Sequence, residues 1–299
     1  MINAIEYFTE RQNGARHSLA ADKDVRRRNA WHLRTVEGNG LAPAGIIGKQ
    51  TYGLHGSSYH GLTVDPREIG VELYADGYSQ TGCQELLDGA RHAVTTGFDG
   101  LGVLRLTNAR GQVYRIGAKC VEFEAKEMRR RVAAVSAVFE CPNPYFEDDV
   151  LHVLPVFNVL GGKAWPLVRP YSFAEIQGGA AGTHALSATN DGDTAAPVTL
   201  KLSGTSLKAV TVTNNTTGAS VVVSGLGGVA GLEICTDPYN AYARLADGGD
   251  ASRYVSLFSS LADFALAPGL NALTITMTAD GLNAAGTQLE WRGRYATCL

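Results

Sequence analysis

The stretch Phe139-Glu140-Cys141-Pro142-Asn143-Pro144-Tyr145-Phe146 separates two halves of the sequence that differ in character. Pro142 and Pro144 each lack a backbone N–H group, and each disfavours the helical conformation in the residue before it. A strand that runs into this stretch therefore has to end there. We place a domain boundary within it, which predicts a first domain over residues 1–144 and a second over residues 145–299.

The two halves also differ in charge density. Residues 1–150 contain 18 Lys+Arg and 19 Asp+Glu, whereas residues 151–299 contain 8 and 10. The second half is instead rich in glycine, alanine, threonine and valine. In a chain of 299 residues, such a shift predicts two domains with different surfaces.

Composition limits the class of protein. The hydrophobic share of 45% is enough for a buried core, and the 35 glycines favour a turn-rich, mainly β chain. The net charge of −3 gives no bulk attraction to nucleic acid or to an anionic membrane. Neither a secretory signal nor an apolar run of roughly 18 residues is present. We therefore expect a chain that is made in the cytoplasm and does not insert into a membrane.

The first half predicts a mixed α+β domain. A hairpin is expected at residues 101–116, and a long antiparallel strand pair over residues 121–126 and 132–139. Before both, an apolar stripe at helical spacing follows the capping-box pair Thr81 and Gln84, which predicts a helix. The stripe comprises Cys83, Leu86, Leu87 and Ala90.

The segment from Gly38 to Gly61, GNGLAPAGIIGKQTYGLHGSSYHG, is too long and too rich in glycine for an ordinary connection. We interpret it as an arm. Such an arm is either mobile or ordered by a partner.

The second half is a series of short strands and turns. Turn signals such as Asn214–Gly218 and Pro268-Gly269 separate segments in which apolar and polar residues alternate. Turns at a spacing of about 8–12 residues predict a β-sandwich or a jelly roll. The expected strands lie at residues 198–203, 210–212, 221–223, 232–234, 273–277 and 289–295.

We predict no catalytic, cofactor-binding or metal-binding residues and no cofactor. The pattern Gly225-x-Gly227-x-x-Ala230 lacks the following helix that a dinucleotide site requires. The run Asp191-Gly192-Asp193-Thr194 lacks the alternating ligands of a calcium loop, so we interpret it as a polar turn. The seven histidines show no metal-ligand spacing.

A serine–histidine nucleophile is also not indicated. His55 and His60 lie close in sequence to Ser57 and Ser58, but the chain has no G-x-S-x-G elbow. We interpret these four residues as solvated loop residues.

Two basic clusters, Arg26–Arg28 and Arg129–Arg131, could contact phosphate, but acidic residues flank both. Clusters of mixed sign more often form salt-bridged surfaces or subunit contacts. We therefore predict no nucleic-acid specificity.

The cysteines are five in number and widely spaced, and no C-x-x-C pair occurs. This pattern indicates neither a zinc site nor a disulfide framework. We expect buried free thiols at Cys83, Cys120, Cys141, Cys235 and Cys298.

A carbohydrate site on the predicted sandwich stays open as an alternative. Such sites combine exposed aromatic rings with polar side chains. The same spacing suits core and edge aromatics, which are commoner. The candidates are Tyr239, Tyr242, Tyr254, Trp291 and Arg292.

The boundary stretch resembles the inter-domain signature of phage distal tail proteins, the siphovirus-type tail component family. In that family a strand ends in a similar F-x-C-P-x-P-Y-F run. Further similar features follow in the same order across most of residues 60–299. They are Pro66–Ile69 before a strand and the helix at 81–92, Asn190–Asp193 before Pro197 and the strand at 198–204, Leu232–Asp237, and Leu266–Leu273, which resembles the family's L-x-P-G-x-N turn.

The resemblance implies a fold and a role. The N-terminal domain would form a ring, usually a homohexamer, with an arm that embraces the neighbour, and the C-terminal domain would be a galectin-like β-sandwich. The ring would be a non-enzymatic hub at the virion tail tip, in the baseplate. It would join the tail tube and tape-measure protein to the tail hub or lysin and to receptor-binding proteins. The alternative hypothesis is a carbohydrate-binding β-sandwich adhesin or tail accessory module.

Overall fold

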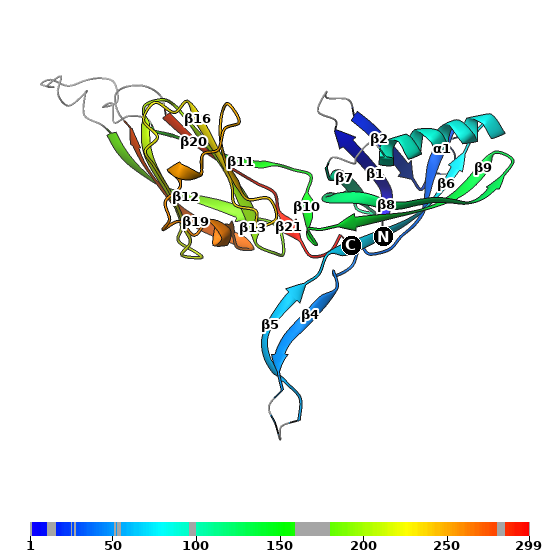
Figure 1. Cartoon of the computed structure of the whole chain (residues 1–299), viewed down its shortest axis with the longest axis horizontal. Coiled ribbons are helices and arrows are strands. Elements are labelled where there is room, and N and C mark those ends of the chain that lie inside the picture. The colour runs from blue at the N-terminus through cyan, green and yellow to red at the C-terminus, as the bar shows by residue number, and fades with distance from the viewer. Residues whose placement is uncertain are drawn as a thin grey trace, which may run out of the picture. The chain divides into compact units, whose positions relative to one another are not determined.

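The computed structural model describes residues 2–10, 16–24, 26, 28–50, 52, 55–95, 100–158, 180–279 and 285–298. The chain divides into two compact units (Figure 1). The first comprises residues 1–149 and 295–299, and the second comprises residues 150–294. The mainly β architecture is confirmed, and the described residues contain one α-helix.

The division differs from the sequence-based boundary at 144/145 at both ends of the second unit. Residues 145–149 belong to the first unit, because Phe146 is fully buried in its core. The C-terminal segment also returns to the first unit, where Cys298 is fully buried. The second unit is therefore inserted into the sequence of the first.

The first unit contains a large sheet. Its strands are β1 (Ile2–Glu10), β2 (Arg16–Asp22), β3 (Ala30–Val36), β6 (Arg67–Asp76), β7 (Gly102–Asn108), β8 (Val113–Arg129), β9 (Val132–Cys141), β10 (Phe146–Asp148) and β21 (Arg294–Tyr295). Over the described residues their order is β21-β10-β8-β7-β1-β2-β3-β6-β9. The 17-residue β8 pairs first with β7 and then with β9, so the order closes on itself. The predicted hairpin and long antiparallel pair are the β7–β8 and β8–β9 pairings.

The predicted helix is α1 (Gln80–Thr95), which lies against the sheet in Figure 1. Cys83, Leu87 and Ala90 of its apolar stripe are buried. The capping prediction is wrong in its residue: the hydroxyl of Ser79 accepts the Gly82 N–H at 3.1 Å. The helix therefore begins at Gln80, one residue before the expected range of 81–92, with Ser79 as its N-cap.

The second unit is a β-sandwich, with two sheets around one hydrophobic core. In the described part of the chain, one sheet has the order β11-β20-β13-β16-β17 with β18 paired to β13, and the other has the order β12-β19-β14-β15. The strands are β11 (His152–Asn158), β12 (Ala180–Asn190), β13 (Ala196–Ser203), β14 (Leu207–Asn214), β15 (Ser220–Ser224), β16 (Gly231–Cys235), β17 (Tyr242–Leu245), β18 (Ala265–Leu266), β19 (Gly269–Ala279) and β20 (Ala285–Trp291), with short 3-10 turns at Ser252–Tyr254 and Leu261–Asp263.

Each strand expected in the second half coincides with part of an observed strand, except that the last one breaks after Trp291. The sequence analysis did not identify β11, β12, β17 and the two-residue β18. Among the described residues, the structure has no helix with the length and apolarity that crossing a membrane requires.

The five cysteines are free thiols, as expected, and four of them are buried. Burial raises the pKa of Cys141 and of Cys298 to about 12, and that of Cys120 to about 11. A thiol is nucleophilic only as the thiolate, so these groups are protonated and unreactive near neutral pH.

We expect the native protein at pH 8 to react slowly with a thiol-specific chromogenic reagent, and all five thiols to react at once in guanidinium chloride. The measurement is the absorbance of the released reporter with and without denaturant. Rapid titration of Cys141 or Cys298 in the native protein would show that their burial is transient.

Candidate assembly surfaces

The segment interpreted as an arm is a hairpin that is exposed on both faces. Its strands β4 (Ala44–Lys49) and β5 (Ser58–Val64) pair with each other and, over the described residues, with no other strand (Figure 1). Every residue of β4 is exposed. At the base, the Asp65 N–H donates to the Pro43 carbonyl at 2.8 Å. Residues 51, 53 and 54 of the predicted arm lie outside the described residues.

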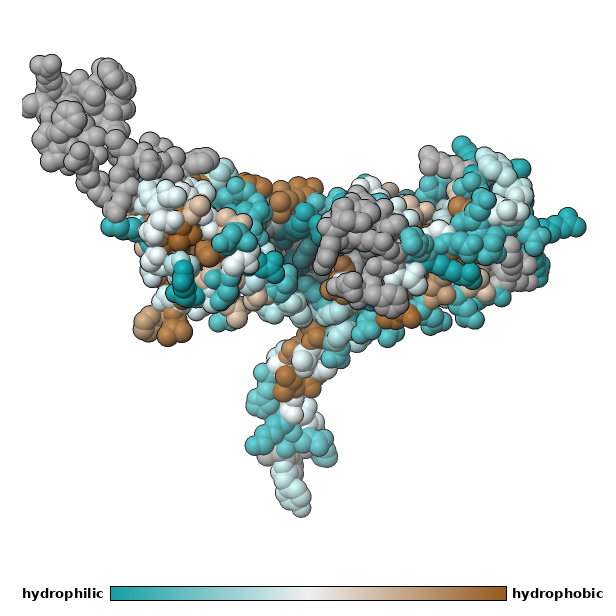
Figure 2. Space-filling view, turned by 45° about the horizontal axis from the view of Figure 1, so that its top comes forward, coloured by the Kyte–Doolittle hydropathy of each residue, from teal (hydrophilic) through white to brown (hydrophobic). Residues whose placement is uncertain are grey.

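The hairpin carries large apolar side chains that contact mainly solvent. Ile46 is 72% exposed and lies directly opposite Leu62, which is 53% exposed. Figure 2 shows brown, hydrophobic surface on the hairpin. Clustered exposed hydrophobic residues mark interaction sites on soluble proteins. Among the described residues of the arm, Leu41, Ile47, Tyr52 and Tyr59 are further large apolar residues that are exposed.

A buried arginine holds the base of this hairpin. The guanidinium of Arg67 donates from Nη1 to the carbonyls of Gly38 (3.1 Å) and Gly40 (2.9 Å). From Nη2 it donates to the carbonyl of Ala296 at 2.7 Å, and its Cζ lies 4.3 Å from the centroid of the Phe146 ring. Arg67 is only 1% exposed. One side chain thus joins the hairpin base, the boundary stretch and the C-terminal segment.

Local sequence explains this arrangement. Core-facing positions alternate along β6, and Arg67 occupies the first of them. Gly38 adopts φ +81°, and a Cβ there would lie 2.0 Å from the Glu68 carbonyl oxygen, so only glycine fits. The sequence analysis quoted Arg67 in the Pro66–Ile69 run without assigning it a role. A charged residue on the apolar face of an alternating strand was the signal that could have identified it.

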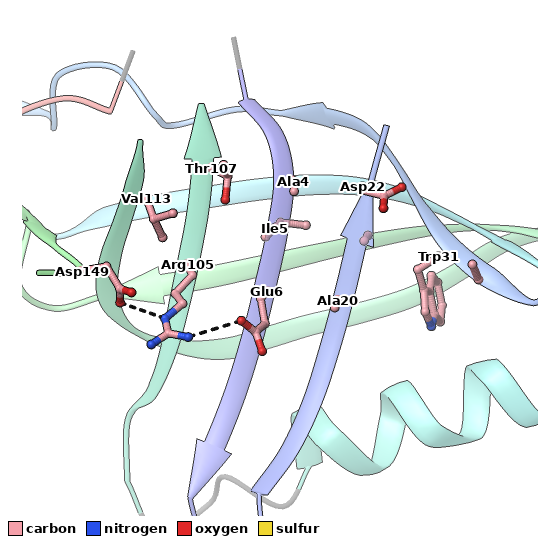
Figure 3. A pocket seen from close by; sticks show the side chains of 12 residues that line it. Ala4, Ile5, Glu6, Ala20, Asp22, Trp31, Arg105, Thr107, Val113 and Asp149 are labelled. Carbon is pink, nitrogen blue, oxygen red and sulfur yellow. Dashed lines mark ion pairs between the residues drawn. The ribbon is translucent and has the colours of Figure 1, made fainter. Parts of the chain in front are cut away.

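A cavity of about 400 Å³ lies at one end of the first unit's sheet (Figure 3). Arg105 spans it: Nε lies 3.0 Å from Oδ1 of Asp149, and Nη1 lies 3.5 Å from Oε2 of Glu6. The guanidinium also covers the ring of Phe8 at 4.9 Å. Arg105, Glu6 and Asp149 are therefore paired with one another in the cavity, an arrangement typical of a structural ion-pair cluster.

The carbohydrate candidates do not form one surface. Trp291 is 7% exposed and its indole N–H donates to the Thr189 carbonyl at 3.1 Å, so its ring belongs to the core. Tyr242 lies on the opposite face of that sheet, where its hydroxyl donates to Glu233. Burial, followed by this hydrogen bond, raises the pKa of Tyr242. Tyr254 lies in a 3-10 turn, and Tyr239 is exposed in a turn before β17. Arg292 directly follows the buried Trp291.

The structure brings Ser58 and His60 together on the arm, with Oγ 3.0 Å from Nε2. The Ser58 hydroxyl donates to the Lys49 carbonyl at 3.1 Å, so its proton is not directed at the imidazole. Both side chains are exposed, as expected, but the expectation of a loop is wrong for them, because Ser58 and His60 belong to the strand β5.

The two glycine- and aspartate-containing patterns form turns. The pattern at residues 225–230 is followed by the strand β16. At residues 191–194, the Asn190 side chain accepts the Gly192 N–H at 2.9 Å and donates to the Thr194 carbonyl at 2.8 Å. No group of three or more potential metal ligands occurs among the residues that the structure describes.

The basic cluster Arg129–Arg131 lies at the tight turn between β8 and β9. Arg130 has φ +51° between β8 and β9, and Arg131 pairs with Asp76 at 3.6 Å. In the other cluster, the backbone N–H of Arg26 is held by the Asp24 carboxylate at 3.1 Å. Arg27 lies outside the described residues.

No protein-family model matches this chain, and no curated protein matches its sequence. Solved structures match its fold. The Dit protein of phage SPP1, described as a paradigm of the hub adsorption apparatus in phages that infect Gram-positive hosts, aligns with TM-score 0.61 and 10% identity, over 97% of this chain and 98% of its own.

Two structures of the phage P2 baseplate in its activated conformation, one with Ca and one with Sr, also match. The TM-scores are 0.53 and 0.52, each at 9% identity, and the alignments cover 94% and 93% of this chain and 99% and 98% of the baseplate chains. The resemblance to phage distal tail proteins is therefore confirmed at the level of the fold: both units of this chain, in their order, have the fold of phage tail hub and baseplate proteins.

Proposed function

We propose that this chain is a non-enzymatic structural protein of a phage or phage-like tail, a distal tail protein at the far end of the tail tube. The observation that carries the proposal is the fold match to the SPP1 hub protein over 97% of the chain. A match that spans nearly all of both chains supports a shared architecture of two units, rather than one common domain on an unrelated protein.

In this proposal the first unit joins copies of the chain into a closed ring. A head-to-tail contact between unlike surfaces forms a closed ring when the rotation from one subunit to the next divides a full turn evenly. We expect about six copies in the ring. The exposed apolar hairpin supports this role, because an arm of this kind gains stability only when a neighbouring subunit covers it.

The second unit, in the same proposal, is a galectin-like sandwich that presents docking surfaces. The ring would connect the tail tube and tape-measure protein to the tail hub or lysin and to receptor-binding proteins. The protein would be made in the cytoplasm of the bacterial host and act at the tail tip of the virion.

Negative-stain electron microscopy of the purified protein, together with native mass spectrometry, tests the proposal. Closed rings of about six copies are expected. Monomers that persist at high concentration and after addition of the tail tube protein would contradict it. Binding of such monomers to a glycan array would then favour a carbohydrate-binding adhesin.

A further inference from the structure

The environment of Arg67 is unusual for a buried cation. Among the described residues no carboxylate pairs with it, and its Nε has no hydrogen-bond partner. Its charge is compensated by three backbone carbonyls and by the face of the Phe146 ring. A buried charge is tolerated only when its hydrogen bonds are made, so each of the three carbonyls matters.

Two of these carbonyls belong to the hairpin base, at Gly38 and Gly40, and the third belongs to Ala296. The same base is held a second time, because the Cys298 N–H donates to the Asn39 carbonyl at 3.1 Å. Residues 295–298, which we call the return segment, therefore contact the hairpin base directly through Cys298 and indirectly through Arg67. Arg67 and Ala296 are 229 positions apart in the sequence.

The return segment has its own attachment to the first unit. The Tyr295 ring lies edge-on against the Tyr114 ring, with centroids 5.2 Å apart, and Cys298 is fully buried in the core. Its position therefore does not depend on Arg67 alone.

We propose that Arg67 and the return segment form a latch that fixes the direction of the hairpin arm. Without residues 295–298 the guanidinium loses its 2.7 Å acceptor and the Asn39 carbonyl loses its donor, and the arm base then loosens. Because this segment is synthesised after the entire second unit, the arm stays unlatched until the chain has passed residue 296. If the proposed ring function holds, the latch delays ring formation until then.

The test is hydrogen–deuterium exchange of the monomeric protein in peptides that cover residues 36–43 and 64–68. Three variants are compared: Arg67→Met, which keeps the side-chain bulk but removes all donors; a chain that stops at Arg294; and their combination. We expect each change to accelerate exchange at the arm base by about tenfold or more. The combination should add little, because both changes break one latch.

Two further variants make the result specific. Tyr295→Ala removes the ring contact with Tyr114 and so loosens the return segment without shortening the chain. If the truncated chain fails to fold, this variant takes its place in the comparison. Arg105→Met removes another guanidinium of the first unit and should leave the arm-base peptides unchanged.

The latch would be overturned if Arg67→Met accelerated exchange while the truncated chain and Tyr295→Ala left it unchanged. It would also be overturned if the effects of Arg67→Met and the truncation were additive. These readouts need no ring. A full-length chain that shows the exchange pattern but never assembles would disprove the proposed ring function and leave the latch intact.

Discussion

We expect the substitution Ile46→Asp to prevent self-assembly while leaving the thermal unfolding of the protein unchanged. Ile46 is 72% exposed and every residue of its strand is exposed, so the folded monomer loses little packing. In an assembly that covers the arm, the same position would bury an isoleucine, which is worth roughly 1.5–3 kcal/mol. A buried, unpaired carboxylate adds a further penalty, so each contact should weaken by about a hundredfold or more.

Native mass spectrometry over a concentration series measures this effect. Ile46→Val keeps the apolar surface and should assemble like the parent. Leu257→Asp places the same charge on a 99% exposed leucine of the second unit and should also leave assembly intact. Normal rings from Ile46→Asp would show that the arm does not make the contact.

The second large effect is expected from Asn271→Asp, which should destabilise the second unit by about 3 kcal/mol at pH 7. The Asn271 amide is fully buried and saturated with hydrogen bonds. Its Nδ2 donates to the carbonyls of Ala267 at 2.7 Å and Gly269 at 3.0 Å. Its Oδ1 accepts from the Ala267 N–H at 2.9 Å and from Nδ2 of Asn214 at 3.2 Å. A carboxylate cannot donate, and it faces both carbonyls with a negative charge.

Calorimetry should show the transition of the second unit lowered by roughly 10 °C. Burial raises the folded-state pKa of the introduced acid above its unfolded value of about 3.9. The loss of stability should therefore grow as the pH rises from about 4, and level off above the folded-state pKa. Asn215→Asp, at an exposed amide on the neighbouring turn, serves as the control and should change stability little. An Asn271→Asp protein that melts with the parent at every pH would contradict this account.

Asn271 also shows why part of the fold could be predicted from sequence. The run Leu266–Leu273 stood out by its resemblance to the family's L-x-P-G-x-N turn, and the structure gives a reason for the asparagine. Its amide closes the turn and also bonds to Asn214 on the neighbouring strand β14. Strands with one face buried were equally visible, because burial on one side enforces alternation, as in Val198, Leu200 and Leu202 of β13.

The alternation of apolar and polar residues that identifies such strands is missing from the strands of the arm and from the return segment. Both faces of the hairpin are exposed, so nothing constrains Ile46 and Ile47 to alternate with polar residues. The contact between Arg67 and Ala296 joins positions 229 residues apart, and no local pattern encodes a pairing at that distance. For Arg67 itself a signal existed, since it precedes Ile69 and Val71 on the core-facing side of β6.

The neighbouring positions of β10 and β21 in one sheet have a consequence for how such a protein can change over time. The chain leaves the first unit after β10 and re-enters it at β21, through strands spaced by about 5 Å. The end of β10 and the start of β21 are therefore adjacent, and any domain whose own N- and C-termini lie close together could be inserted between these two strands. Recombination at these two points could exchange the whole module for another, while the sheet, the arm and the arginine beneath it are inherited unchanged.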